Sequence, residues 1–312
     1  LPNMERPMNK KLRRLCPASL SLALVALGGL WAFTALAGDL TVDNLNVYQN
    51  AGVYGNLTVI KGPADAPLLH YSFDSQPASG VVVDESFHGN TGTVYGAGVI
   101  WTNECRAGTN AFYFDNTEQG NYIDVDYGSS LQLTGPYTLS AWIKPEVPGE
   151  AGAPGIIGKA SEGSSEYGLM WASGGALAFI SSGSDMWSYM WTTNVVAPVG
   201  AWRHVVGGLG GSGANQAKLY VDGELVLQGT MRLPLAGSNP LYVGRWRDQY
   251  YFKGCIDDPR IYDRALTATE VQQLHSGTLN YSSPTGAVFR VDDTEVTISR
   301  LNQQGDINMG TF

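Results

Sequence analysis

Short apolar runs, separated by glycine and proline, dominate the chain from residue 68 onward. These runs are rich in Val, Ile, Tyr and Trp, which is typical of strands in a sandwich or barrel. In residues 137–145 (YTLSAWIKP), packing side chains occupy both alternating sets of positions, as in a strand that is buried on both faces. In residues 218–226 (KLYVDGELV), Asp222-Gly223 separates two alternating runs and predicts a β-hairpin. The pattern therefore predicts an all-β fold.

One segment has the pattern of a helix. Thr267 can cap a helix that runs to Leu274, and Glu270 lies at the position that completes a capping box. Val271 and Leu274 then form one apolar face. The sequence predicts a single short helix near residue 270.

The two ends of the chain differ in texture from its centre. The pentads GDLTV and GNLTV begin at Gly38 and Gly55, and they indicate short strands of a repeating β unit. Proline and glycine mark two linkers, and the last residues alternate again as in strands. We therefore predict a signal peptide at 1–37, a β-repeat segment at 38–60, a linker at 61–67, the main sandwich at 68–277, and a linker with a C-terminal β tail at 278–312.

The first 37 residues have the features of an export signal. A basic patch at residues 10–14 precedes an apolar run at 18–33, and Ala35-Leu36-Ala37 has the small residues of a cleavage site. The apolar run approaches the roughly 20 residues that span a membrane, so an uncleaved anchor is the alternative. Both readings predict a secreted or cell-surface protein.

Charge and cysteine content fit that compartment. The formal net charge is −9, which argues against a nucleic-acid partner. Cys16 lies in the predicted signal peptide, which leaves Cys105 and Cys255. Because disulfides persist outside the cell, we predict one bridge between these two residues. Neither has a second Cys or a His at the spacing of metal ligands.

Several segments, in the same order as in the family, resemble the laminin-G-like domains of bacterial secreted proteins, a branch of the concanavalin A-like lectin/glucanase superfamily. They begin with LLHYSFD at 68–74 and DESFHGNTG at 84–92, and they end with FKGCIDDPRIYDRALTATEVQQL at 252–274. The resemblance covers about 210 residues. It implies a jelly-roll sandwich of two antiparallel sheets. Pro259 departs from the family pattern and predicts an edge or a bulge in its strand.

The resemblance also implies a structural calcium ion. The matching positions are Asp84 and Asn90 in the loop after the first strand, and Asp257 in the late acidic strand. Calcium takes six to eight oxygen ligands, which carboxylates and backbone carbonyls supply. In the alternative interpretation, Asp84 and Asn90 bind turn amides, and Asp257 pairs with Arg260 or Arg264.

The sequence offers little for catalysis. Retaining glucanases of the superfamily carry Glu-x-Asp-x-x-Glu on one strand, which places paired carboxylates on one face, and no such pattern occurs here. A G-x-S-x-G nucleophile motif is also absent. The four histidines are interpreted as structural or loop residues: His70, His88, His204 and His275. We therefore predict a protein that is not an enzyme, with a glycoside hydrolase as a distant alternative.

Aromatic residues among polar neighbours are the strongest functional signal. Sugars pack on aromatic rings while their hydroxyls bond to polar groups nearby. The candidate ligand contacts are Trp187, Tyr189, Trp191, Trp246, Tyr250 and Tyr251. The first three share one strand face by spacing, so they are either all buried or all presented, and burial of some of them is the favoured alternative.

Two functions remain open from the sequence. The first is a carbohydrate-binding module that acts outside the cell. The second is a structural or adhesive surface protein that assembles through residues 38–60 and 287–312. Loss of glycan binding on mutation of the aromatic residues would favour the first, whereas oligomers that need the terminal segments would favour the second.

Overall fold

The computed structural model describes residues 65–281 apart from 87, 117–119, 126–128, 150–152, 162–163, 183–186, 194–197, 211–215 and 248, together with the backbone of five terminal strands. The chain divides into two units, Lys61–Thr285 and the combination of Leu1–Ile60 with Gly286–Phe312. Each unit is described by itself. The repeat segment at 38–60 lies outside the described residues.

In the terminal unit the described residues are all strands. β1 (Ala23–Leu27) pairs with β2 (Leu30–Thr34) within the predicted signal peptide. β21 (Ala287–Val291), β22 (Val296–Leu301) and β23 (Ile307–Met309) form a three-stranded antiparallel sheet. The tail therefore forms strands, while cleavage of the leader and assembly through the ends stay predictions. No helix among the described residues is long and apolar enough to span a membrane.

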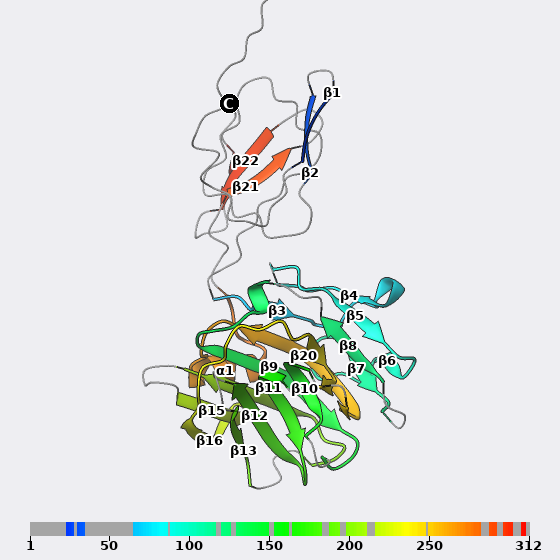
Figure 1. Ribbon diagram of the computed structural model, residues 1–312, viewed down its shortest axis with the longest axis vertical. Helices are drawn as coiled ribbons and strands as arrows, with labels where there is room; N and C mark the ends of the chain where they lie inside the picture. Colours follow the sequence, from blue (N-terminus) through cyan, green and yellow to red (C-terminus); the bar gives the residue numbers. More distant parts are fainter. Residues whose placement is uncertain are drawn as a thin grey trace, which may run out of the picture. The chain divides into compact units, whose positions relative to one another are not determined.

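Lys61–Thr285 contains two large antiparallel sheets (Figure 1). Sheet 1 has the strand order β13 (Trp187–Trp191), β12 (Ala176–Ser182), β11 (Ser164–Ala172), β10 (Gly155–Ser161), β17 (Leu241–Val243), β8 (Tyr122–Val125), β5 (Gly92–Tyr95) and β4 (Val81–Val82). Sheet 2 has the order β16 (Glu224–Thr230), β15 (Gln216–Val221), β14 (Arg203–Leu209), β9 (Tyr137–Pro145), β20 (Gly254–Tyr262), β7 (Ala111–Phe114) and β6 (Val99–Thr102), and β3 (Leu69–His70) pairs with β20. Two 3₁₀ turns, η2 (Ala78–Gly80) and η3 (Ser129–Leu131), lie in the connections. The predicted two-sheet antiparallel sandwich is confirmed.

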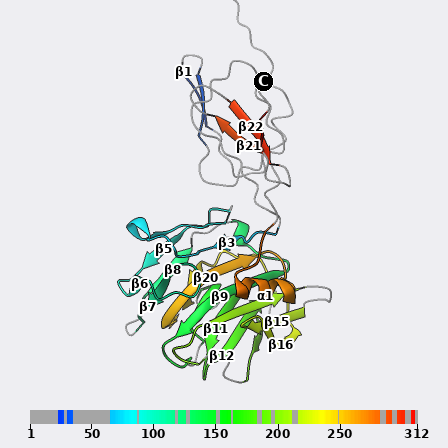
Figure 2. The same cartoon turned by 180° about the vertical axis from the view of Figure 1, so that it is seen from behind.

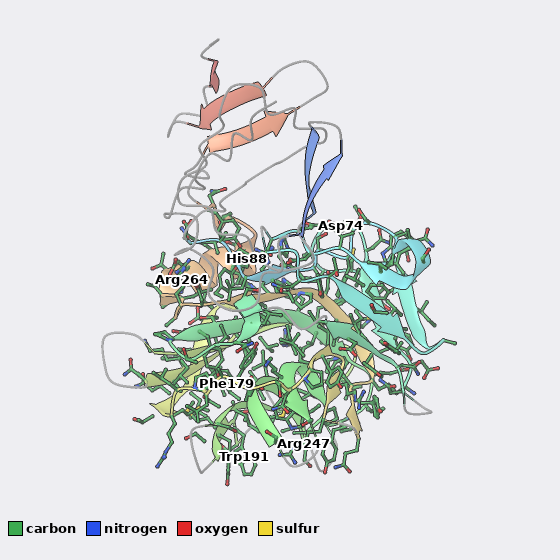
Figure 3. The ribbon with its side chains drawn as sticks, turned by 45° about the horizontal axis from the view of Figure 1, so that its top comes forward. Asp74, His88, Phe179, Trp191, Arg247 and Arg264 are labelled. Atoms are coloured by element: carbon green, nitrogen blue, oxygen red, sulfur yellow. The ribbon has the colours of Figure 1, made fainter. Side chains whose placement is uncertain are left out.

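The core lies between the facing sides of the two sheets. Phe179 of β12 is fully buried, and its ring is 5.5 Å from that of Tyr137 of β9 (Figure 3). Leu139, Ala141 and Ile143, the alternate residues of β9, are buried in the same core. Because side chains alternate across a strand, the remaining residues of each strand point away from this core.

The hairpin turn and the capped helix formed where the sequence predicted them. Asp222 and Gly223 both have positive φ, which is the geometry of a two-residue hairpin turn between β15 and β16. α1 (Ala268–Ser276) begins after Thr267, whose capping box with Glu270 is complete. It ends at Gly277, which is in the left-handed conformation.

The two outer faces of the sandwich are covered differently. α1 lies against sheet 2 (Figure 2), and its Val271 and Leu274 pack on the outer side of that sheet with Val206 and Tyr220. β20 lies in the middle of sheet 2, and its register shifts between Asp257 and Arg260. Pro259 therefore lies in a bulge and not at a sheet edge. On sheet 1, a small hairpin of β18 (Arg245–Trp246) and β19 (Tyr250–Tyr251) carries aromatic residues.

Candidate functional site

The outer face of sheet 1 gathers most of the aromatic residues that the sequence singled out. In β12, Phe179 faces the core, so its neighbours Ala178 and Ile180 face outward. The pairing register places Trp191 opposite Ala178 and Tyr189 opposite Ile180. Directly opposed residues lie on the same side of a sheet, so both aromatic residues belong to the outer face.

Tyr189 and Trp191 form an exposed aromatic pair on the edge strand β13. Their side chains are 56% and 57% exposed, and their ring centroids are 5.1 Å apart. Trp191 lies at the periphery of the sandwich in Figure 3. These two residues are therefore presented and not buried, and the favoured burial of some members of the set is left to Trp187 as a prediction. The side chain of Trp187 lies outside the described residues.

Trp246 is a buried packing residue, so its predicted role as a ligand contact is wrong. Its side chain is 3% exposed. It lies directly on Gly158 and Gly168, where an added Cβ would come within 2.6 Å and 2.3 Å of the indole ring. Tyr250 packs beside it in the same small outer cluster, which also contains Met170. This cluster fills the middle of the outer face.

A second aromatic cluster lies on the other side of that filled centre. The guanidinium of Arg245 is 4.4 Å from the ring centroids of Tyr122 and Tyr242 and 5.5 Å from that of Tyr251. Tyr95, which is half exposed, stacks on Tyr122 at 5.0 Å. Such cation–π contacts fix the rings in place. Tyr251 was a predicted contact, and the other three tyrosines are brought to it by strand pairing.

Tyr122 and Tyr242 were not predicted as contacts, although the sequence contains part of the information needed to find them. Tyr122 alternates with the core residues Ile123 and Val125 in its strand, and Tyr242 precedes the core residue Val243. Alternation predicts that both point away from the core. It does not predict that β8 and β17 are neighbours, which is a property of the tertiary fold.

The predicted calcium ligands have other hydrogen-bond partners in this structure, and calcium binding stays a prediction. Asp84 Oδ1 accepts hydrogen bonds from the backbone N–H groups of His70 and Ser86, and its Oδ2 accepts from Asn90 N and Ser86 Oγ. Asn90 Oδ1 accepts from Ser130 Oγ. These bonds leave the oxygens little capacity for a cation. Across the described residues, no three His, Cys, Asp or Glu side chains form a metal-binding group. The arrangement fits the alternative in which Asp84 and Asn90 bind turn groups.

Asp257, the third predicted ligand, anchors a loop instead. Its Oδ2 accepts hydrogen bonds of 2.8 Å from the backbone N–H groups of Arg106 and Ala107, while its Oδ1 is buried without a partner in the described residues. Burial raises the pKa of Asp257 to about 7, and the carboxylate of Asp258 adds to the shift. The proposed pairing of Asp257 with Arg260 or Arg264 is wrong, since Arg260 binds Asp258 and Arg264 binds Glu270.

The raised pKa of Asp257 predicts a pH-dependent stability. Unfolded aspartate has a pKa of about 4, so between pH 4 and 7 the folded chain keeps a proton that the unfolded chain has released. This contribution is complete below pH 4 and is lost as the pH rises to 7, with a slope of at most about 1.4 kcal/mol per pH unit. Asp257→Asn should remove this contribution to the pH dependence of the unfolding free energy, which urea unfolding at a series of pH values measures.

The comparison of Asp257→Asn with the parent isolates this one group. His204, whose pKa burial lowers to about 3, contributes in the opposite direction between pH 3 and 6.5, because its unfolded form binds a proton that its folded form excludes. That contribution is common to both proteins and cancels in the difference. A difference in unfolding free energy that is constant from pH 4 to 7 would show that Asp257 is ionised throughout.

Cys105 and Cys255 are free thiols in this structure, so the predicted disulfide is not formed in it. Their sulfur atoms contact Gly108 O and Glu104 Oε2, respectively. The two segments nevertheless lie beside each other, because Arg106 and Ala107 bind Asp257. Burial raises the pKa of the Cys255 thiol to about 12, which keeps it protonated. Pairing after oxidation stays a prediction.

The described geometry agrees with the comparison to protein families. Residues 116–272 match the family model described as the concanavalin A-like lectin/glucanases superfamily. The chain belongs to this superfamily. The match covers the strands that form most of both aromatic clusters, from β8 to β20. No curated protein matches the chain.

Solved structures with this fold include sugar-bound and toxin binding domains. Domain 4 of AbnA, a GH43 extracellular arabinanase from Geobacillus stearothermophilus in complex with arabinotriose, is 25% identical with a TM-score of 0.54, over 68% of this chain and 99% of that domain. The binding domain of botulinum neurotoxin serotype G is 17% identical (TM-score 0.54, over 67% of this chain), and that of Paraclostridial Mosquitocidal Protein 1 is 15% identical (TM-score 0.55, over 77% of this chain and 65% of that chain). This chain spans about half of the serotype G domain. The likeness to the toxins shows the fold alone.

Proposed function

We propose that this protein is a non-catalytic carbohydrate-binding module that acts outside the cell. The observation that carries the proposal is the exposed pair of Tyr189 and Trp191 on the outer face of sheet 1. Two adjacent rings, held by a β-strand, present a rigid apolar surface on which sugar rings can pack.

The buried centre of the outer face argues for a surface platform and against a deep cleft. Trp246 and Tyr250 cover the middle strands, where a long substrate trough would need open space. A ligand would then bind at the edge strand β13, where the rings of Tyr189 and Trp191 are accessible. The arabinanase domain with bound arabinotriose supports an oligosaccharide as the ligand class, because that domain matches over nearly its whole length. The acidic net charge and the predicted export signal support action outside the cell.

The double substitution Tyr189→Ala with Trp191→Ala tests the proposal. Both side chains are exposed, so the fold should survive and glycan affinity should fall at least tenfold, the loss expected when an anchoring aromatic worth about 2 kcal/mol is removed. Binding is measured by calorimetry with arabino-oligosaccharides first and then with hits from a glycan array.

A matched control removes exposed apolar surface elsewhere. Leu225→Ala changes a side chain that is also about half exposed but lies on β16 of sheet 2. It should leave glycan affinity unchanged. A double variant that keeps its fold and binds the glycan as tightly as the parent would contradict the proposal, and so would a parent protein that binds no glycan on the array.

A further inference from the structure

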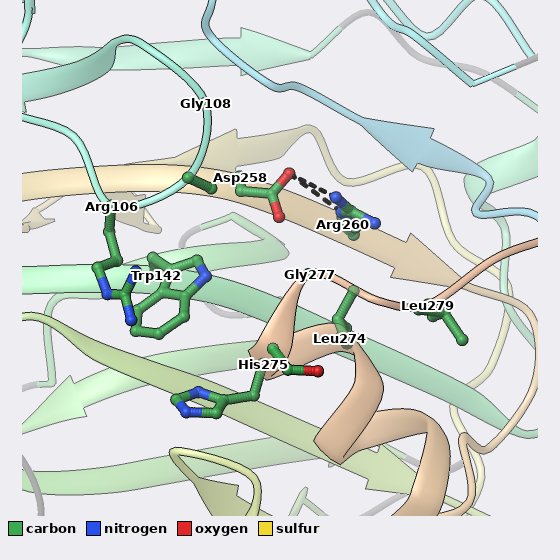
Figure 4. A pocket seen from close by; sticks show the side chains of 11 residues that line it. Arg106, Gly108, Trp142, Asp258, Arg260, Leu274, His275, Gly277 and Leu279 are labelled. Atoms are coloured by element: carbon green, nitrogen blue, oxygen red, sulfur yellow. Dashed lines mark hydrogen bonds and ion pairs between the residues drawn. The ribbon is translucent and has the colours of Figure 1, made fainter.

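A cavity of about 230 Å³ lies on the outer side of sheet 2, at the C-terminal end of α1. Arg106, Trp142 and Asp258 line it together with His275 and Leu274 of the helix (Figure 4). Neither of the aromatic clusters described above contributes to it. The cavity is therefore separate from the site proposed for oligosaccharides.

Two hydrogen-bond donors in this cavity have no partner among the described residues. The Arg106 guanidinium lies over the Trp142 ring, 4.4 Å from its centroid, and forms no ion pair with a described residue. The indole nitrogen of Trp142 likewise has no hydrogen-bond partner in the described part of the chain, and in Figure 4 it faces the space between Asp258 and His275. A guanidinium that lies over an aromatic ring and has no counter-ion favours a planar anion such as a carboxylate.

The position of Arg106 is fixed by its loop. The backbone N–H groups of Arg106 and Ala107 donate to the buried carboxylate of Asp257, and Thr109 Oγ1 donates to Asp74 Oδ1 at 3.0 Å. Two carboxylates thus hold the loop over Trp142. This arrangement orders the loop before any ligand arrives, which lowers the entropic cost of binding.

Asp258 supplies an acceptor on the opposite wall. Its Oδ1 accepts from His70 Nε2 at 2.7 Å and from Nε and Nη2 of Arg260 at 3.1 and 2.9 Å. Its Oδ2 receives none of these bonds, and in Figure 4 it turns toward the cavity. Asp258 also compensates the charge of Arg260, whereas Arg106, the other arginine that lines the cavity, has no counter-ion among the described residues.

The donors and the acceptor define the ligand chemistry. A carboxylate satisfies Arg106 and the Trp142 indole N–H, while a hydroxyl of the same molecule donates to Asp258 Oδ2. A dianion such as hydrogen phosphate suits the cavity less well, because it brings a second negative charge against the carboxylate of Asp258. A volume of about 230 Å³ is below the roughly 300 Å³ at which sites for larger ligands begin, and it suits one sugar ring.

We propose that this cavity binds a sugar acid of monosaccharide size, a uronate, with its carboxylate on Arg106 and a ring hydroxyl on Asp258. This site lies on sheet 2, whereas Tyr189 and Trp191 lie on sheet 1. It would give the protein a second ligand, an acidic sugar. It does not depend on the oligosaccharide platform, so the two proposals can fail separately.

Nuclear magnetic resonance of the indole N–H groups provides the test. The full chain, labelled with ¹⁵N, is titrated with glucuronate, glucose and inorganic phosphate, and Trp142→Phe assigns the resonance of Trp142. Glucuronate should shift this resonance in a saturable way, while glucose and phosphate should leave it unmoved. Arg106→Gln should weaken glucuronate binding at least tenfold, and Arg106→Lys should weaken it less, because lysine keeps the charge but loses the planar fork.

Two controls separate the site from the rest of the molecule. Arg232→Gln removes an exposed arginine outside the cavity and should not change the affinity for glucuronate. The double variant at Tyr189 and Trp191 should also keep the glucuronate response. An equal response to glucose, stronger binding of phosphate, or unchanged glucuronate affinity in folded Arg106→Gln would overturn the proposal.

Discussion

Lys159→Met should lower the free energy of unfolding by about 3–5 kcal/mol, because it leaves the carboxylate of Glu166 buried without its cation. Lys159 is 1% exposed, and its Nζ donates to Glu166 Oε2 at 2.7 Å and to Gly237 O at 2.6 Å. Glu166 Oε1 also accepts from Asn239 N. The pair thus attaches the segment before β17 to sheet 1. Urea unfolding of the parent and the variant at pH 7 measures the loss.

An exposed ion pair gives the matched comparison. Arg203 and Asp222 are 3.1 Å apart, but their side chains are about one third exposed, and solvent screens such a pair. Arg203→Met should therefore cost less than about 1 kcal/mol. Equal losses for Lys159→Met and Arg203→Met would mean that the buried pair is not the source of the effect.

Trp246→Ala should destabilise the protein by about 3–5 kcal/mol and leave glycan affinity nearly unchanged in the protein that remains folded. The indole fills the space above Gly158 and Gly168, and its removal leaves a cavity on the outer face of sheet 1. Backbone and small side chains form the floor, so the surroundings have few groups that can move inward. Thermal and urea unfolding measure the loss of stability, and calorimetry below the unfolding transition measures glycan affinity.

The contrast with Tyr189 and Trp191 makes this prediction specific. Trp191→Ala removes a ring that is mostly in solvent and should change stability by less than about 0.5 kcal/mol. Trp246→Ala should therefore lower the stability without changing glycan affinity, whereas Trp191→Ala should lower glycan affinity without changing the stability. Loss of glycan binding in Trp246→Ala with full stability would show that the ring is presented to ligand after all.

Local patterns in the sequence determined the strands, the turn at Asp222-Gly223 and the capped helix, because each depends on residues close together in the chain. The core residues of β9 also followed from alternation alone. The same rule predicted that Tyr189 and Trp191 share a face. It could not predict whether that face is exposed, because exposure depends on what packs there.

Tertiary structure decided which aromatic residues can meet a ligand. Trp246 and Trp191 both lie in stretches with polar residues, yet one covers two glycines of neighbouring strands and the other stands on an edge strand. The cavity at Arg106 joins a loop, a central strand, a bulge and a helix end that are far apart in the sequence. Such sites arise from strand order and from the bulge at Asp258, which are long-range properties that no local pattern encodes.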